Sequence, residues 1–275
     1  MGHKYQIYLV SDSTGETINR IFLALKSQFT NFDYEKKEYV FVRTENQINK
    51  IIEDSQKKEQ VIILYTIVET KLAKYLSQEC DNKKIPCFGI LGNLILNFSK
   101  LLNKKATHTP SAQHVLDDEY YKRIEAIQFS MSHDDGMKTE DIKSADVILL
   151  GVSRTSKTPT SIYLANRGYK TLNIPLVGNQ EIPTILKEEN NKFCVIGLVV
   201  DPSRLSDIRI NRLETMKEIN IPNYSNLDFV QKEVEDSKKL FKKYNWPIID
   251  VTRKSVEETA ASAIRIYEIK KGYKQ

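Results

Sequence analysis

Short apolar runs alternate along this chain with longer segments in which apolar residues recur every three or four positions. In the first half, the runs predict strands at Tyr5–Val10, Glu38–Val42, Val61–Thr66 and Pro86–Phe88. The helical period predicts intervening helices at Ile18–Phe29, Glu45–Gln56 and Glu69–Cys80. Strands that alternate with helices in this way indicate a parallel sheet covered by helices.

The alternation starts again after a polar interval at Gln128–Glu140. Further strands are predicted at Ala145–Val152, Tyr169–Ile174, Phe193–Val200 and Trp246–Val251, and further helices at Ser203–Ile219, Asp228–Tyr244 and Ser255–Tyr267. The sequence shows no internal repeat. We therefore predict an α/β protein with an N-terminal parallel-sheet βα domain (1–130) and a C-terminal P-loop kinase-like α/β domain (131–275).

The segment between the Ala145–Val152 strand and the next helix has the composition of a phosphate-binding loop. It matches the pattern G-x-x-x-x-G-K-[ST] except for serine at the second glycine, and its residues are Gly151, Val152, Ser153, Arg154, Thr155, Ser156, Lys157 and Thr158. Backbone N–H groups at a helix start bind anions. Lys157 would add charge for a terminal phosphate and face solvent in the empty site, and Thr158 would offer its hydroxyl to Mg²⁺. The alternative is an ordinary strand-to-helix turn with an exposed lysine.

Asp201 ends the next apolar run, Phe193–Val200, about forty residues further on. A carboxylate at the end of such a strand is typical of the second metal-binding position in P-loop enzymes. In the alternative interpretation, Asp201-Pro202-Ser203 only caps the following helix.

Three other segments suggest chemistry. Ser11–Thr17 follows the first strand, and the spacing of Ser13 and Glu16 predicts a capping box, with a second oxyanion-binding nest or a surface for a phosphorylated partner as the functional alternative. His133-Asp134-Asp135-Gly136 could supply a general base and a metal ligand, although the pattern also favours a plain turn. The predicted helix Ser203–Ile219 carries candidate phosphate clamps at Arg204, Arg209 and Arg212.

Composition narrows the class of protein. Of 275 residues, 40% are hydrophobic and 28% charged, as in ordinary water-soluble proteins, and no apolar run is long enough to span a membrane. Because the sequence has no signal-peptide pattern, we expect a cytoplasmic protein. We expect its three cysteines to be small core residues. The net charge of +5 is modest, and lysines are interleaved with glutamates, which argues against a nucleic-acid-binding track.

Several of these segments together resemble the pyruvate, phosphate dikinase regulatory protein family. The resemblance rests on Ile7–Thr17, His133–Gly136, Gly151–Pro159, Ile249–Thr252 and Glu257–Ala260, and it runs nearly from end to end. Serine at the second glycine position is the family's own form of the loop. The family's nucleotide-binding loop corresponds to Gly151–Thr158.

The resemblance implies a bifunctional enzyme. Family members use ADP to phosphorylate a threonine of the dikinase, which inactivates it, and remove the phosphate with inorganic phosphate, releasing pyrophosphate. On chemical grounds, Lys157 and the loop amides would hold ADP, Thr158 and Asp201 the Mg²⁺ shell, and Arg154 the transferring group. Asp135 or Asp134 would accept the threonine proton, and His133 would orient the phosphate.

Other functions stay open from sequence alone. The same chemistry on phosphoenolpyruvate synthase is one alternative, because a sister branch of the family acts on that enzyme. An ATP-dependent small-molecule P-loop kinase and a non-catalytic nucleotide-sensing protein are two further alternatives. The sequence does not decide the oligomeric state, so a homodimer is one option.

Overall fold

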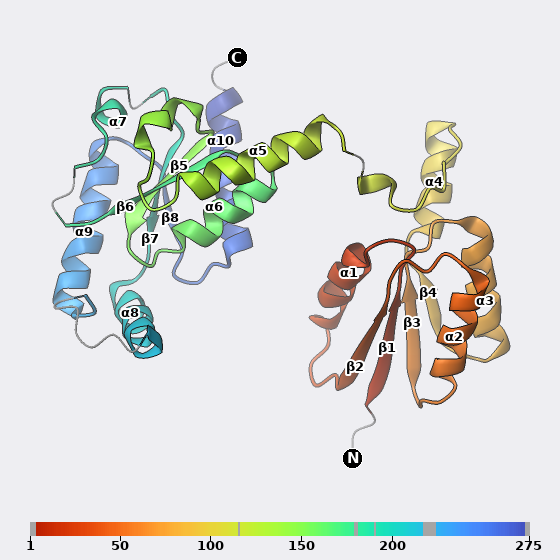
Figure 1. The fold of residues 1–275 in the computed structure, drawn as a ribbon. Coiled ribbons are helices and arrows are strands. Elements are labelled where there is room, and N and C mark those ends of the chain that lie inside the picture. Colours follow the sequence, from red (N-terminus) through yellow and green to blue (C-terminus); the bar gives the residue numbers. More distant parts are fainter. Residues whose placement is uncertain (1–3, 115, 179–180, 190, 217–223, 273–275) are drawn as a thin grey trace. The chain divides into compact units, whose positions relative to one another are not determined.

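The computed structural model describes residues 4–114, 116–178, 181–189, 191–216 and 224–272. Contacts divide the chain into two compact units, Met1–Val115 and Leu116–Gln275. Each unit is an α/β structure built on one four-stranded parallel sheet, as the sequence predicts (Figure 1). Within the described residues no helix is both long and apolar enough to cross a membrane.

The N-terminal unit has the strand order β2-β1-β3-β4, with all neighbouring strands parallel. Its elements are β1 (Tyr5–Val10), α1 (Glu16–Lys26), β2 (Tyr34–Tyr39), α2 (Glu45–Ser55), β3 (Val61–Tyr65), α3 (Thr70–Asn82), β4 (Cys87–Gly89), α4 (Gly92–Leu102) and the short η1 (Ala112–His114).

Alternate residues of β1 face opposite sides of this sheet, as the two-residue period of a strand requires. Ile7 and Leu9 belong to a core cluster with Phe22 of α1. Tyr8 and Val10 belong to another, with α2 and α3. Figure 1 accordingly shows α1 on one face of the sheet and α2 with α3 on the other. The central strand is therefore buried on both sides.

The C-terminal unit repeats this plan with the strand order β6-β5-β7-β8, again all parallel. Its elements are α5 (Asp118–Ser132), η2 (Thr139–Ser144), β5 (Val147–Val152), α6 (Lys157–Asn166), β6 (Thr171–Leu176), α7 (Thr184–Glu188), β7 (Val195–Val199), α8 (Pro202–Met216), α9 (Leu227–Lys243), β8 (Ile248–Asp250) and α10 (Val256–Gly272). All six residues of β5 are buried.

The shared strand order defines one special position in each unit. The chain leaves the central strand, adds the second strand on one side, and then returns to add the third on the other side. Ligands of open α/β sheets bind at the carboxyl ends of the two strands where this reversal occurs. In the N-terminal unit these are β1 and β3, and in the C-terminal unit β5 and β7.

Several predicted boundaries differ from the structure. The units divide at Val115, earlier than the predicted 130, because α5 packs against α6 and β6 of the C-terminal unit. The second strand is Tyr34–Tyr39, not Glu38–Val42: it is a polar edge strand, so hydrophobicity does not reveal it. The helix predicted at Ser203–Ile219 is described to Met216, and its last three residues lie outside the described part.

Cysteine positions agree with the expectation. All three thiols are free; Cys80 and Cys194 are buried within core clusters, and Cys87 packs against one of them. Ser255 and Glu258 form a capping box at the start of α10, with reciprocal backbone-to-side-chain hydrogen bonds of 2.8 and 3.2 Å.

Candidate functional site

The loop between β5 and α6 begins at a glycine that no other residue can replace without displacement of the backbone. A Cβ atom on Gly151 would lie 2.7 Å from Thr155 Oγ1 and 2.8 Å from the carbonyl oxygen of Leu198 on β7. Thr155 is fully buried, and its hydroxyl donates to the carbonyl of Val152. The strand and the loop are therefore packed too closely for a side chain at position 151.

Two non-glycine residues of this loop adopt the left-handed conformation, Arg154 (φ 73°) and Ser156 (φ 59°). Ser156 is the N-cap of α6, and no side chain caps the helix. The first backbone N–H groups of α6 therefore stay available for an anion. Serine at the second glycine position thus takes the backbone conformation that glycine usually provides, at a cost of roughly 1–2 kcal/mol.

Lys157 is buried, so the expectation that its side chain faces solvent is wrong. Only 5% of the residue is exposed, and Nζ donates a hydrogen bond of 2.9 Å to the carbonyl of Val152. Burial lowers the pKa of its amine to about 8, although the nearby carboxylates of Asp135 and Asp134 act in the opposite direction. An anion bound in the loop would raise this pKa again, because it favours the charged form of the amine.

Asp134 joins this loop to the His133–Gly136 segment. The Thr158 hydroxyl lies 3.0 and 3.1 Å from the two Asp134 carboxylate oxygens. Asn173 on β6 donates through Nδ2 to both Asp134 and Thr158. The Asn173 Oδ1 atom is buried and has no hydrogen-bond partner within the described residues. Sequence reasoning missed Asn173, whose only signal is a polar residue inside an otherwise apolar strand.

The turn interpretation of the His133–Gly136 segment is confirmed, and its role as a general base or metal ligand stays a prediction. It forms a turn, with Asp135 (φ 54°) and Gly136 (φ 79°) in the left-handed region and the N–H of Met137 donating to the Asp134 carbonyl. The same turn presents the two carboxylates toward Lys157. Asp135 is exposed, and its carboxylate makes no hydrogen bond or ion pair with any described residue.

Contacts within the C-terminal unit fix the His133 side chain. Its Nδ1 lies 2.7 Å from the carbonyl of Phe129, its Nε2 lies 3.1 Å from Asp141, and its ring stacks on the Phe129 ring. Only 4% of the residue is exposed. Both ring nitrogens are thus engaged in fixing the end of α5 against η2, which leaves none free to orient phosphate as the sequence suggested.

Asp201 caps the start of α8, as the alternative interpretation of the sequence proposed. Its carboxylate accepts the backbone N–H of Arg204 at 3.0 Å, which caps the start of α8, and its own N–H donates to Thr252. Among described residues, the carboxylate bonded to Thr158 is that of Asp134. No group of three or more histidine, cysteine, aspartate or glutamate side chains forms a metal cluster in the described part of the chain. The metal role of Asp201 stays a prediction.

Arg209 is the arginine of α8 that contacts the loop. It is 2% exposed, donates through Nη2 to the carbonyl of Ser153 at 3.2 Å, and pairs with Glu233 at 2.7 Å. Its guanidinium also lies over the Tyr224 ring, 4.8 Å from the centroid. Arg154 is exposed and donates to the Tyr224 hydroxyl at 3.4 Å. The sequence placed three arginines on this helix without showing which one faces inward.

The N-terminal loop, Ser11–Thr17, occupies the corresponding place in its own unit. The predicted capping box is wrong: Gly15, not Ser13, is the N-cap of α1, with φ 82° and no side-chain cap. The Ser13 hydroxyl instead accepts a hydrogen bond from Ser111 at 3.0 Å. Here too the first N–H groups of a helix stay uncapped.

Comparison with known proteins finds similarity over almost the whole length of the chain. The model of the Kinase/pyrophosphorylase family matches residues 7–264. A protein of Pelagibacter ubique, named "Putative pyruvate, phosphate dikinase regulatory protein", is 64% identical over 98% of this chain and 99% of its own length. A protein of Erythrobacter litoralis with the same name is 42% identical over 96% of this chain and 94% of its own length.

Proposed function

The chain belongs to the Kinase/pyrophosphorylase family, and from this we propose that it regulates pyruvate, phosphate dikinase. We propose that it phosphorylates an active-site threonine of that enzyme with ADP and removes the phosphate with inorganic phosphate. The relatives' names support the dikinase as partner. The observation that carries the proposal is that one hydrogen-bonded group, Thr158 with Asp134 and Asn173, joins the uncapped loop to a carboxylate-bearing turn.

The loop residues have distinct roles in this proposal. The N–H groups at the start of α6 and the Lys157 amine bind the ADP phosphates, and Arg154, exposed at the loop, neutralises the group in transfer. Thr158 and Asp134 offer a hydroxyl and a carboxylate oxygen of the kind that Mg²⁺ prefers. Mg²⁺ would neutralise phosphate charge there. Arg209 positions the loop through the Ser153 carbonyl.

Asp135 is the better candidate for the general base because its carboxylate is free, whereas Asp134 is held by Thr158 and Asn173. In the forward direction the threonine oxygen attacks the β-phosphorus of ADP, AMP leaves, and the hydroxyl proton passes to Asp135. In the reverse direction an oxygen of inorganic phosphate attacks the phosphothreonine phosphorus. Pyrophosphate forms, and the threonine oxygen leaves and regains a proton.

The role of Asp135 predicts unequal losses in the two directions. Asp135→Asn should lower threonine phosphorylation about 10²- to 10⁴-fold and phosphorolysis far less, because only the forward nucleophile is a neutral hydroxyl. AMP and pyrophosphate release measure the two rates. Glu140→Gln, at an exposed acid of η2, is the matched control and should leave both rates unchanged. Equal losses in both directions would assign Asp135 to binding instead.

The metal assignment predicts a ranking of two carboxylates. Asp134→Asn should raise the Mg²⁺ concentration needed for half-maximal activity more than Asp201→Asn does, because Asp134 contacts Thr158 while Asp201 caps α8. Activity titrated with Mg²⁺ measures both. The reverse ranking would return the metal to Asp201.

The partner and the donor are tested together. The protein is incubated with pyruvate, phosphate dikinase or with phosphoenolpyruvate synthase, and with ADP or ATP, and the active-site peptides are then weighed by mass spectrometry. The proposal expects phosphorylated dikinase peptide and AMP in the ADP reactions. Modified synthase would move the activity to that enzyme. Conversion of ATP to ADP with a small metabolite indicates an ordinary kinase, and nucleotide binding without any transfer indicates a sensor.

A further inference from the structure

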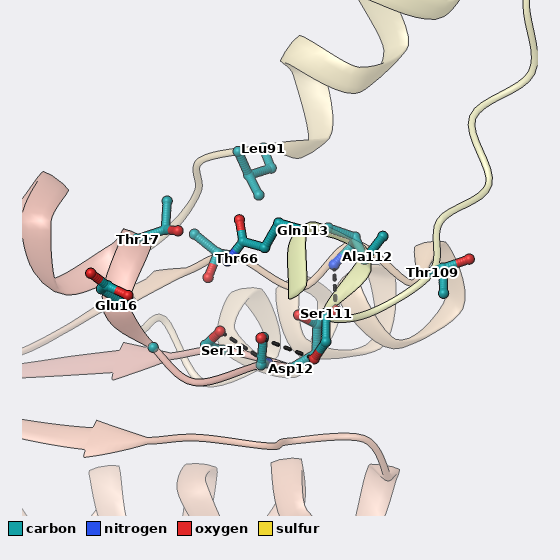
Figure 2. Close-up of a pocket in the computed structure, with 13 residues that line it drawn as sticks. Ser11, Asp12, Glu16, Thr17, Thr66, Leu91, Thr109, Ser111, Ala112 and Gln113 are labelled. Carbon is teal, nitrogen blue, oxygen red and sulfur yellow. Dashed lines mark hydrogen bonds between the residues drawn. The ribbon is translucent and has the colours of Figure 1, made fainter. Parts of the chain in front are cut away.

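We propose that a second site, in the N-terminal unit, binds inorganic phosphate. It is a pocket of about 200 Å³ at the carboxyl ends of β1 and β3, the position where open α/β sheets bind ligands. Its walls come from Ser11–Ser13 and Gly15–Thr17, from Thr66 and Val68 after β3, and from residues 109 and 111–113 (Figure 2). This site does not depend on the proposed function, because every residue that forms it lies in the N-terminal unit.

Backbone donors face this pocket. Gly15 is the N-cap of α1 in the left-handed conformation, and no side chain caps the helix, so the N–H groups of Glu16 and Thr17 have no capping acceptor. Gly15, Glu16 and Thr17 all line the pocket. An eleven-residue helix carries a partial positive charge at this end, which favours an anion there.

Two buried hydroxyls provide the independent observation that a ligand belongs here. Thr66 lines the pocket with 4% of its surface exposed, and its hydroxyl bonds to no described residue. Ser11, 3% exposed, accepts the N–H of Ser13 at 3.1 Å and keeps its own proton to donate. Figure 2 shows both side chains beside the same space.

Arg43 supplies positive charge at the edge of the pocket. Its Nε donates to the carbonyl of Asp12 at 3.1 Å and its Nη2 to the hydroxyl of Ser111 at 3.2 Å, and both partners line the pocket. The nearby negative charge of Glu16 is directed elsewhere, because its side chain is exposed and lies 3.9 Å from Arg20. The edge therefore favours an anion.

Asp12 decides which anion. It is 3% exposed, and its Oδ2 accepts the N–H of Val68 at 2.8 Å, so the carboxylate is an acceptor built into the wall. A carboxylate repels an oxyanion without a proton but accepts a hydrogen bond from one that carries a proton. Inorganic phosphate keeps a proton at neutral pH. Sulfate has none, and a phosphomonoester, with its second pKa near 6, has lost most of its own.

The test uses the amide signals of Gly15, Glu16 and Thr17 in proton–nitrogen NMR spectra of the full chain, which report on this pocket and not on the C-terminal loop. Phosphate is expected to shift these signals saturably in the millimolar range, and sulfate or phosphothreonine at equal ionic strength is expected to leave them nearly unchanged. Thr66→Val keeps the side-chain shape and should weaken phosphate binding about tenfold, the effect of one hydrogen bond to a charged group. Thr30→Val, at an exposed threonine of the same unit, is the control.

Selectivity gives a second variant. Asp12→Asn replaces the acceptor by an amide that can donate, so sulfate should now shift the same amides. No response to phosphate in the wild type overturns the proposal. An equal response to sulfate overturns it as well, because the pocket would then be a general anion surface. A response to phosphothreonine that exceeds the response to phosphate assigns the pocket to a phosphorylated protein instead. None of these outcomes changes the ADP experiment described above.

Discussion

The loops after β1 and after β5 occupy the same position in two units of identical strand order, yet they carry opposite charges. Their sequences are Val10-Ser11-Asp12-Ser13-Thr14-Gly15-Glu16-Thr17 and Val152-Ser153-Arg154-Thr155-Ser156-Lys157-Thr158. Gly15 and Ser156 are both left-handed N-caps without a side-chain cap. With Thr14 as one extra residue, Asp12 corresponds to Arg154 and Glu16 to Lys157.

The comparison separates what the backbone does from what the side chains do. Both loops present uncapped N–H groups at the reversal point of a parallel sheet, so both favour anions. The C-terminal loop adds Lys157 and Arg154, which suit the several charges of a nucleotide phosphate chain. The N-terminal loop adds the acceptor Asp12, which suits a single protonated oxyanion. The backbone therefore provides an anion site in both units, and in our proposals the side-chain charges of each loop select its ligand.

The largest expected effect concerns two arginines, each of which donates a hydrogen bond to a backbone carbonyl of one loop. Arg209→Ala should lower the free energy of unfolding of the C-terminal unit by about 3 kcal/mol, because it leaves Glu233 and the Ser153 carbonyl without their buried partner. Arg43→Ala, at an exposed side chain bonded to the Asp12 carbonyl, should cost less than about 1 kcal/mol. Circular dichroism follows both units during urea unfolding, and fluorescence of the single tryptophan, Trp246, identifies the transition of the C-terminal unit. Equal costs would show that the two arginines have equivalent roles.

Lys157 gives the next effect, and it depends on pH. Lys157→Met should abolish ADP binding and raise the stability of the C-terminal unit at pH 7 by about 1–3 kcal/mol, because a buried ammonium is replaced by an apolar chain. In the wild type the lysine pKa is about 8 when folded and near 10.4 when unfolded. The unfolded chain therefore binds more protons between these values, and wild-type stability rises with pH there. The gain of the variant should shrink from pH 8 to 10.5.

Urea unfolding of both proteins at several pH values measures this difference, and the other titrating groups cancel because they are common to both. A constant difference across that range would mean that Lys157 titrates normally and that its burial has no electrostatic cost. Lys170→Met, at a lysine paired with Glu125, is the control for the replacement of a lysine outside the loop.

Much of the fold could be predicted from the sequence, because buried strands and amphipathic helices have periods that survive in the order of residues. The polar strand β2 was not predicted correctly, because an exposed edge strand has no hydrophobic period. The burial of Lys157 and the role of Asn173 escaped because they depend on contacts between β5, β6 and the 133–136 turn, which are distant in sequence. The sequence did not reveal that the two units share one strand order, because Thr14 shifts the register of one loop against the other and their charges are reversed.

The smallest expected effect, that of Ser156→Gly, belongs to an exchange of the two N-cap residues. Gly15→Ser should destabilise the N-terminal unit by about 1–3 kcal/mol, since φ is 82° and a Cβ would lie 2.8 Å from Val40 Cγ1. Ser156→Gly should stabilise the C-terminal unit by up to about 1 kcal/mol, because Ser156 is exposed and pays for its left-handed conformation without a side-chain cap in return. Thermal unfolding followed by circular dichroism and tryptophan fluorescence separates the two transitions. A loss of stability in Ser156→Gly would show that the serine hydroxyl has a partner in the folded loop, and the two N-caps would then differ in more than the residue that fills them.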